Sequence, residues 1–227
     1  MMKFKVLFLF LLLTHLLSAQ MKSVIGQTQY PFWIHLPTAE VVNNKPPLLV
    51  FLHGRSLSGT NLNRVKRYGV LNAIEKGLQI PAIVIAPQVA SGSWNPDKVL
   101  ELINYIKKNY DINENKIYVC GMSLGGYGTL HFAGKYPDKI TAGVAICGGG
   151  NVPDGCRLSK VPLWIEHGTN DRAVPLSESQ KVVNAIKKCN PEAELKFIVV
   201  PGGTHGSVER IFHRSEMYDW LLSHEKK

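Results

Sequence analysis

Short apolar runs alternate along the chain with longer segments in which apolar residues recur every three or four positions. Runs that are almost continuously apolar and rich in β-branched residues are typical of strands buried on both faces of a parallel sheet. Such runs occupy residues 48–52, 82–86, 116–120, 142–147, 161–165 and 195–200. A more alternating stretch at residues 27–36 is expected to form an edge strand.

The longer segments between the runs have the spacing of amphipathic helices. We expect helices over residues 62–74, 96–106, 126–134, 177–186 and 207–221. Asn95 fits an N-cap before Pro96, and Ser177 has capping-box spacing to Gln180. Alternating strands and helices predict an α/β fold, with one mostly parallel sheet flanked by helices on both faces. Ligands of such sheets bind at the carboxyl ends of the strands.

The beginning of the chain has the pattern of an export signal rather than of a folded element. Two lysines precede an unbroken apolar run at residues 6–13, and Ala19 is a small residue suited to a cleavage point. This run is shorter than the roughly 20 apolar residues that span a bilayer. The sequence therefore predicts a secretory signal peptide at residues 1–20 and one folded domain at residues 21–227. We expect a secreted or periplasmic protein without stable membrane insertion.

Composition narrows the class of protein only a little. With 227 residues, 45% of them hydrophobic and 19% charged, the chain is too apolar for a disordered protein. The formal charge of +9 falls by two when Lys3 and Lys5 leave with the signal peptide. The remaining excess fits a solvated basic surface, and no basic stripe interleaved with aromatic residues indicates nucleic acid. The sequence gives no sign of an oligomeric state.

Four cysteines are too few to be the main framework of a chain this long, but outside the cytosol a disulfide can persist. Cys120 lies in a predicted core strand and is expected to be a small buried apolar residue. Cys147, Cys156 and Cys189 lie nearer to predicted surface loops or helix ends. Three complete pairings are possible, so we expect one bridge that involves Cys156 and leave its partner open.

The residues that carry chemistry follow the ends of the predicted strands. The segment Gly121-Met122-Ser123-Leu124-Gly125 separates the strand at residues 116–120 from the next helix, which is the context of a nucleophile elbow. The turn is sharp, so bulk two residues before or after Ser123 would collide with a neighbouring element. We therefore expect Ser123 to be a nucleophile held in a strained backbone conformation.

A serine hydroxyl is a poor nucleophile without a base, and the base needs an acceptor to fix its tautomer. His205 follows the strand at residues 195–200 in a glycine-rich loop, and Asp171 follows the strand at residues 161–165. The order Ser, Asp, His is that of α/β-hydrolases. The alternatives are an exposed loop histidine and an Asx-turn in which Asp171 bonds its own loop.

Two backbone amides are needed to stabilise the oxyanion that forms when the serine attacks a carbonyl. One is expected on Leu124, directly after the nucleophile. The other is expected on Arg55 in the loop after the strand at residues 48–52, with Ser56 as the alternative.

The candidate substrate-binding residues are Ser56, Met122 and Trp94. Trp94 follows the strand at residues 82–86, where it could stack on a sugar or an aromatic acyl group, or cover the helix that starts at Pro96. Three histidines, His53, His167 and His205, could in principle hold a metal, but each lies on a different loop beside a proposed catalytic element. We expect no metal and no cofactor, and we expect His53 to be structural.

The segments LHGRS, GMSLGG, HGTNDRAVP and GGTHG, in this order, resemble the α/β-hydrolase superfamily. Within it they are similar to small esterases of the phospholipase/carboxylesterase and dienelactone-hydrolase-like branches, and to catalytic domains related to prolyl oligopeptidase. The resemblance covers roughly residues 28–222, nearly the whole mature chain. Dienelactone hydrolases use a cysteine nucleophile, so Ser123 departs from that branch.

The resemblance implies a serine carboxylester hydrolase that acts through an acyl-enzyme. About 11 residues separate Gly150 from Val161, which leaves no room for the helical lid that many members insert there. An open site and export favour a small-molecule or carbohydrate ester as substrate, and we expect its acyl group to be acetyl or feruloyl. The alternatives are a serine peptidase for short peptides, and a non-catalytic protein that binds carbohydrate or the cell envelope.

Overall fold

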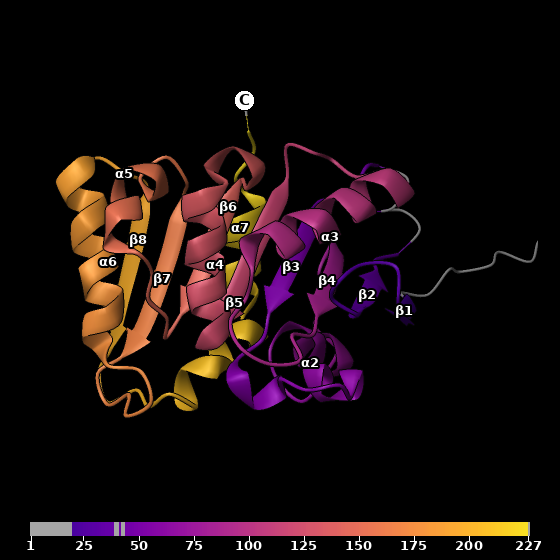
Figure 1. Ribbon diagram of the computed structural model, residues 1–227, viewed down its shortest axis with the longest axis horizontal. Helices are drawn as coiled ribbons and strands as arrows, with labels where there is room; N and C mark the ends of the chain where they lie inside the picture. The colour runs from indigo at the N-terminus through magenta and orange to yellow at the C-terminus, as the bar shows by residue number, and fades with distance from the viewer. Residues whose placement is uncertain (1–19, 39–40, 42–43, 227) are drawn as a thin grey trace, which may run out of the picture.

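An eight-stranded sheet runs through the molecule (Figure 1). The computed structural model describes residues 20–38, 41 and 44–226. Its strands are β1 (Gln20–Val24), β2 (Phe32–Leu36), β3 (Leu48–Leu52), β4 (Ile83–Pro87), β5 (Ile117–Met122), β6 (Ala142–Ile146), β7 (Leu163–Gly168) and β8 (Leu195–Val200). Their order is β1-β2-β4-β3-β5-β6-β7-β8, with β2 antiparallel to both of its neighbours and β3 to β8 parallel. The six apolar runs therefore all form strands, as predicted.

The two edges of the sheet differ from the prediction. β3 to β7 are buried along their whole length, but β8 is half-buried because it has a neighbour on one side only. β2 lies between β1 and β4, so the expectation that residues 27–36 form an edge strand is wrong. The edge is β1, whose exposed, polar sequence gave no strand signal.

Helices cover both faces of the sheet, as predicted. One face carries α3 (Pro96–Asn109), α4 (Leu124–Lys135), α5 (Gly155–Leu158) and α6 (Leu176–Cys189). The other carries α2 (Val70–Glu75), the 3-10 helix η5 (Ser207–His213) and α7 (Ser215–Leu222). Further 3-10 turns are η1 (Arg55–Leu57), η2 (Leu62–Lys66), η3 (Pro137–Lys139) and η4 (Val152–Asp154). Between β6 and β7 the chain forms only η4 and α5, which agrees with the absence of a helical lid.

Some predicted helix ends are confirmed and others are wrong. The side chain of Asn95 accepts a hydrogen bond from the Asp97 amide at 2.8 Å, so the N-cap of α3 is confirmed. The capping box of Ser177 is wrong, because α6 already begins at Leu176 and has no side-chain cap. The helix expected over residues 62–74 is divided at Gly69, whose φ of 80° interrupts helical geometry.

A disulfide joins Cys156 to Cys189, so the expected bridge involves Cys156 and its partner is now identified. It ties α5 to the last residue of α6, and Figure 1 shows these two helices side by side. Cys120 is a free buried thiol, as predicted. The placement of Cys147 near the surface is wrong, because its side chain lies buried behind the end of β6.

The predicted signal peptide lies outside the described residues except for Gln20, with which β1 begins. Among the residues that the structure does describe, none of the helices combines the length and apolar character needed to cross a bilayer.

We predict that replacing Cys156 and Cys189 together by serine lowers the free energy of unfolding by about 2–4 kcal/mol, because the bridge closes a 33-residue loop in the unfolded chain. Urea denaturation of the oxidised protein and of the double variant measures the difference. The wild-type protein under reducing conditions should resemble the double variant. An unchanged midpoint in both would contradict a stabilising role for the bridge.

Candidate active site

Ser123 occupies a sharp turn between β5 and α4. Its backbone has φ 58° and ψ −119°, a conformation that side chains rarely adopt, which is the strain that the elbow motif predicts. A side chain at Gly125 would overlap the carbonyl oxygen of Leu52 at the end of β3. A side chain at Gly121 would lie 2.6 Å from the same oxygen and 2.5 Å from that of Gly125. Both glycines are therefore required for the turn to fit against its neighbouring strand and helix.

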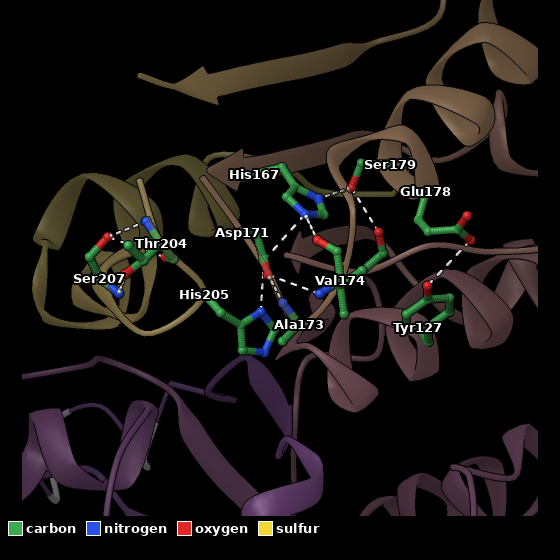
Figure 2. A network of polar contacts seen from close by, with 11 residues as sticks. Tyr127, His167, Asp171, Ala173, Val174, Glu178, Ser179, Thr204, His205 and Ser207 are labelled. Atoms are coloured by element: carbon green, nitrogen blue, oxygen red, sulfur yellow. Dashed lines mark hydrogen bonds and ion pairs between the residues drawn. The ribbon is translucent and has the colours of Figure 1, made fainter. Parts of the chain in front are cut away.

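His205 and Asp171 come together from the loops after β8 and β7 (Figure 2). The distance from Nδ1 of His205 to Oδ2 of Asp171 is 2.7 Å. A carboxylate only accepts, so Nδ1 carries the hydrogen and Nε2 is left as the basic nitrogen. The Asp171 carboxylate also accepts hydrogen bonds from the amides of Ala173 and Val174 at 2.9 Å each, so the Asx-turn and the contact with His205 coexist.

Hydrogen bonds hold Asp171 in its charged form. The side chain is fully buried, and burial acts to raise its pKa. The hydrogen bonds that the carboxylate accepts outweigh burial and hold the pKa of Asp171 below its ordinary value. In order of effect, the donors are the Val174 amide, His205, the Ala173 amide and Cys147. The carboxylate is therefore available to orient His205 and to stabilise it when protonated.

Ser123 and His205 open into one cavity of about 790 Å³ at the carboxyl ends of the strands. Its wall consists of Gly54, Arg55, Ser56, Tyr68, Met122, Ser123, Leu124, Tyr127, Ala173, Val174, His205, Gly206 and Glu209. The candidate residues Ser56 and Met122 therefore lie where a substrate would bind. Tyr68, Tyr127 and Glu209 also line the cavity, although they belong to no strand-end motif and no sequence pattern indicated them.

The loop after β3 passes close to the nucleophile. A side chain at Gly54 would lie 2.7 Å from the hydroxyl of Tyr68, 3.3 Å from the carbonyl oxygen of Met122 and 3.4 Å from Cβ of Ser123, so glycine leaves room for these neighbours. In the part of the chain that the structure describes, no backbone hydrogen bond starts from the amides of Arg55, Ser56 or Leu124. These amides are thus free to donate to an oxyanion, and the choice between Arg55 and Ser56 stays open.

Trp94 does not line this cavity, so its assignment as a substrate-binding residue is wrong. Its side chain is 3% exposed, and its indole N–H donates to the carbonyl oxygen of His53 at 3.0 Å. The ring packs against α4, where a side chain at Gly128 would lie 2.8 Å from it. Trp94 therefore fills the space between α4 and the loop after β3.

His53 is structural, as expected. Its Nδ1 donates to the carbonyl oxygen of Gly54 at 2.7 Å, and its Nε2 accepts from the amide of Val89 at 3.2 Å. Burial lowers the pKa of His53 to about 4, so the ring stays neutral. Together with Trp94 it holds the loop that carries the Arg55 amide.

A second histidine lies behind Asp171. Ligand-type atoms of Cys147, His167 and Asp171 lie within 4.8 Å of one another, whereas His53, His167 and His205 form no such group among the described residues. Both nitrogens of His167 already face protein acceptors, and the Asp171 oxygens already accept several hydrogen bonds. We therefore interpret the cluster as a hydrogen-bonded one. Both Cys147 and His167 lie near predicted strand ends, and this position was the sequence signal for the cluster.

This fold and this arrangement define an α/β-hydrolase of the serine esterase class. A model of the phospholipase/carboxylesterase family matches residues 93–218, which is more than half of the chain. The chain belongs to this family.

Individual relatives point in the same direction. A bifunctional acetylxylan esterase/xylanase from Neocallimastix patriciarum is 29% identical over 147 residues, which cover 61% of this chain and 21% of the relative. The crystal structure of a thermostable esterase superposes with a TM-score of 0.75 at 26% identity, covering 92% of this chain and 64% of that one. A feruloyl esterase module from Clostridium thermocellum, complexed with sinapinate, superposes with a TM-score of 0.66 at 16% identity over 88% and 87% of the two chains, which shows the shared fold alone. The chain thus spans about a fifth of the curated relative that it matches.

We predict that Gly125→Ala destabilises the protein by at least about 1–3 kcal/mol, because the new methyl group overlaps the Leu52 carbonyl and the elbow must move. Urea denaturation measures this loss. The matched control is Gly206→Ala, since Gly206 has φ −75° and no atom within 4 Å of the added carbon. The control should stay within about 0.5 kcal/mol of wild type. Equal stability of the two variants would show that the turn is not tightly packed.

Proposed function

We propose that this protein is an exported serine esterase in which Ser123, His205 and Asp171 form the catalytic triad. The single observation that carries the proposal is the hydrogen bond between His205 and the buried Asp171. His205 lines the same cavity as Ser123, which lies on a strained turn. The base is thereby oriented toward the same space as the hydroxyl. Family membership supports the reaction class.

The proposed reaction is acyl transfer in two steps. Nε2 of His205 takes the proton of Ser123 as its oxygen attacks the ester carbonyl, and the Arg55 and Leu124 amides hold the resulting oxyanion. His205 then gives this proton to the leaving alcohol, and an acyl-enzyme remains on Ser123. Water attacks the acyl group in the same way and releases the acid, which restores Ser123. The steps require no metal and no cofactor.

The substrate that we propose is an acyl ester of a carbohydrate, with acetyl as the first choice. An acetylxylan esterase activity is named for the relative that aligns with 61% of this chain. A cavity without a helical lid is accessible to a bulky alcohol such as a sugar chain. A feruloyl ester is a second possibility, which rests on the family resemblance of the motifs.

Export is part of the proposal. The basic start and the apolar run of residues 1–20 support a cleaved signal peptide that leaves residues 21–227 as the catalytic domain. The Cys156–Cys189 bridge supports an oxidising compartment, because such bridges rarely persist in the cytosol. We propose a secreted or periplasmic enzyme.

We predict that a fluorophosphonate probe labels wild-type protein on Ser123, because the probe traps a serine whose proton a neighbouring base removes. Ser123→Ala should lose labelling and ester turnover while its circular dichroism spectrum is unchanged. Ser159→Ala, at a half-buried serine after α5, is the matched control and should label like wild type. Peptide mapping of the labelled site and active-site titration provide the measurement. Folded wild-type protein that stays unlabelled would favour the non-catalytic alternative.

We predict that p-nitrophenyl acetate is hydrolysed far faster than an aminoacyl p-nitroanilide, because an amide expels its leaving group less readily than an ester. A panel of acetyl, butyryl, longer acyl and feruloyl esters, followed by acetylated xylan, gives the acyl preference as ratios of kcat/KM. Turnover of the anilide at a comparable kcat/KM would favour the peptidase alternative.

A further inference from the structure

His167 is the last buried side chain before the loop that carries Asp171, and it packs directly behind that carboxylate. Its Nε2 lies 2.9 Å from the carbonyl oxygen of Val174 and 3.4 Å from Oδ2 of Asp171. Its Nδ1 lies 2.7 Å from Oγ of Ser179 on α6. Figure 2 shows the two histidines on either side of Asp171. His205 is the one that lines the cavity. The mechanism proposed above uses only one of them.

The hydrogens on His167 follow from its partners. A carbonyl and a carboxylate only accept, so Nε2 must carry a hydrogen. The hydroxyl of Ser179 donates its one hydrogen to the carbonyl oxygen of Gly148 at 2.8 Å. With its hydrogen directed to Gly148, that hydroxyl accepts at its contact with Nδ1 of His167, so the geometry favours a hydrogen on Nδ1 as well. A ring with hydrogens on both nitrogens is an imidazolium.

Cys147 supplies a further donor on the same side. Its positive φ of 47° after β6 brings the thiol to Asp171. Burial raises the pKa of Cys147 to about 12, and the neighbouring carboxylate contributes, so the thiol keeps its hydrogen. The thiol and the His167 ring thus both face a carboxylate whose other contacts are two backbone amides and His205.

We propose that His167 is a positioning residue that acts on the triad as a buried imidazolium and shares the Asp171 carboxylate with His205. This inference rests on the proposed function, in which Asp171 orients the base. The positive charge of His167 offsets the negative charge of Asp171, so protonated His205 is stabilised less than by an unshared carboxylate. Removing the charge of His167 is therefore expected to strengthen the attraction between Asp171 and protonated His205.

Most other charged groups nearby are already paired, and Arg172, beside Asp171, is exposed to solvent. Glu209, which lines the cavity with His205, accepts from the Gly69 amide at 2.7 Å and contacts His213 at 3.5 Å. Glu166, one residue before His167 in β7, contacts Arg214 at 3.2 Å, and Glu178 on α6 contacts Lys181 at 2.8 Å and the hydroxyl of Tyr127. Facing His167 itself, the described titratable groups are Asp171 and Cys147. The charge balance at Asp171 is therefore set mainly by the two histidines.

The test replaces His167 by glutamine, which keeps an N–H donor but removes the charge. We expect kcat to fall about 10- to 100-fold, because the flexible amide positions Asp171 less well than the packed ring and this loss outweighs the stronger attraction to protonated His205. The fall should be smaller than the roughly 10⁴-fold cost of losing the Asp–His hydrogen bond itself. KM should stay within about threefold of wild type, and the acidic limb of the pH profile of kcat/KM should move up by about half to one pH unit. The matched control is His35→Gln, the same exchange at a buried histidine in β2 far from the triad. It should leave the pH profile unchanged.

Two further measurements keep the outcome unambiguous. Ser179→Ala removes the acceptor of Nδ1 and should move the acidic limb in the same direction, which matters if His167→Gln does not fold. In wild-type protein labelled with ¹⁵N-histidine, NMR at pH 7 should show two protonated nitrogens on His167. One unprotonated nitrogen, or a wild-type pH profile in folded His167→Gln or Ser179→Ala, overturns the inference. Absence of ester turnover and of Ser123 labelling in the wild type would instead overturn the proposed function, and the NMR result would still stand alone.

Discussion

The close contact between the first turn of α4 and the end of β3 is the constraint on which the site depends. The backbone at Gly125 touches the carbonyl of Leu52, and the backbone at Gly54 lies beside Ser123. At Gly125 this approach leaves no space for a side chain. Because β3 and β5 are neighbours in the sheet, Ser123 and the loop after β3 are brought to the same cavity. A side chain at Gly125 would force the elbow to move.

The remaining parts of the site are supplied by the same geometry, farther along the sheet. β7 and β8 are paired in parallel, so their following loops meet, and Asp171 reaches His205 without any distortion of the strands. The carboxylate is fixed first by its own loop amides and then by contacts from β6 and β7. Asp171 is therefore held both by its own loop and by residues at the ends of the neighbouring strands.

Features of the fold and site that are set by residues close together in the sequence could be predicted from it, and features set by distant residues could not. The strands and the positions of Ser123, Asp171 and His205 follow from short runs and motifs at strand ends, where neighbours in sequence decide the structure. The role of Trp94 did not, because its environment is made by Gly128 and His53, which are distant in sequence. The same reason explains Cys147, whose burial depends on the closed sheet. Long-range packing, which a single sequence does not display, decided both cases. The cap at Ser177 failed for a local reason, because α6 begins one residue earlier, at Leu176.

The fold also limits which cysteines can form a disulfide. Cys120 and Cys147 end up sealed against the same face of the sheet, whereas Cys156 and Cys189 meet on helices of the opposite face. A pairing that used Cys120 or Cys147 would require their buried side chains to leave this packing. In the assembled fold Cys156 and Cys189 are the two cysteines that meet, so the native structure itself selects the native bridge.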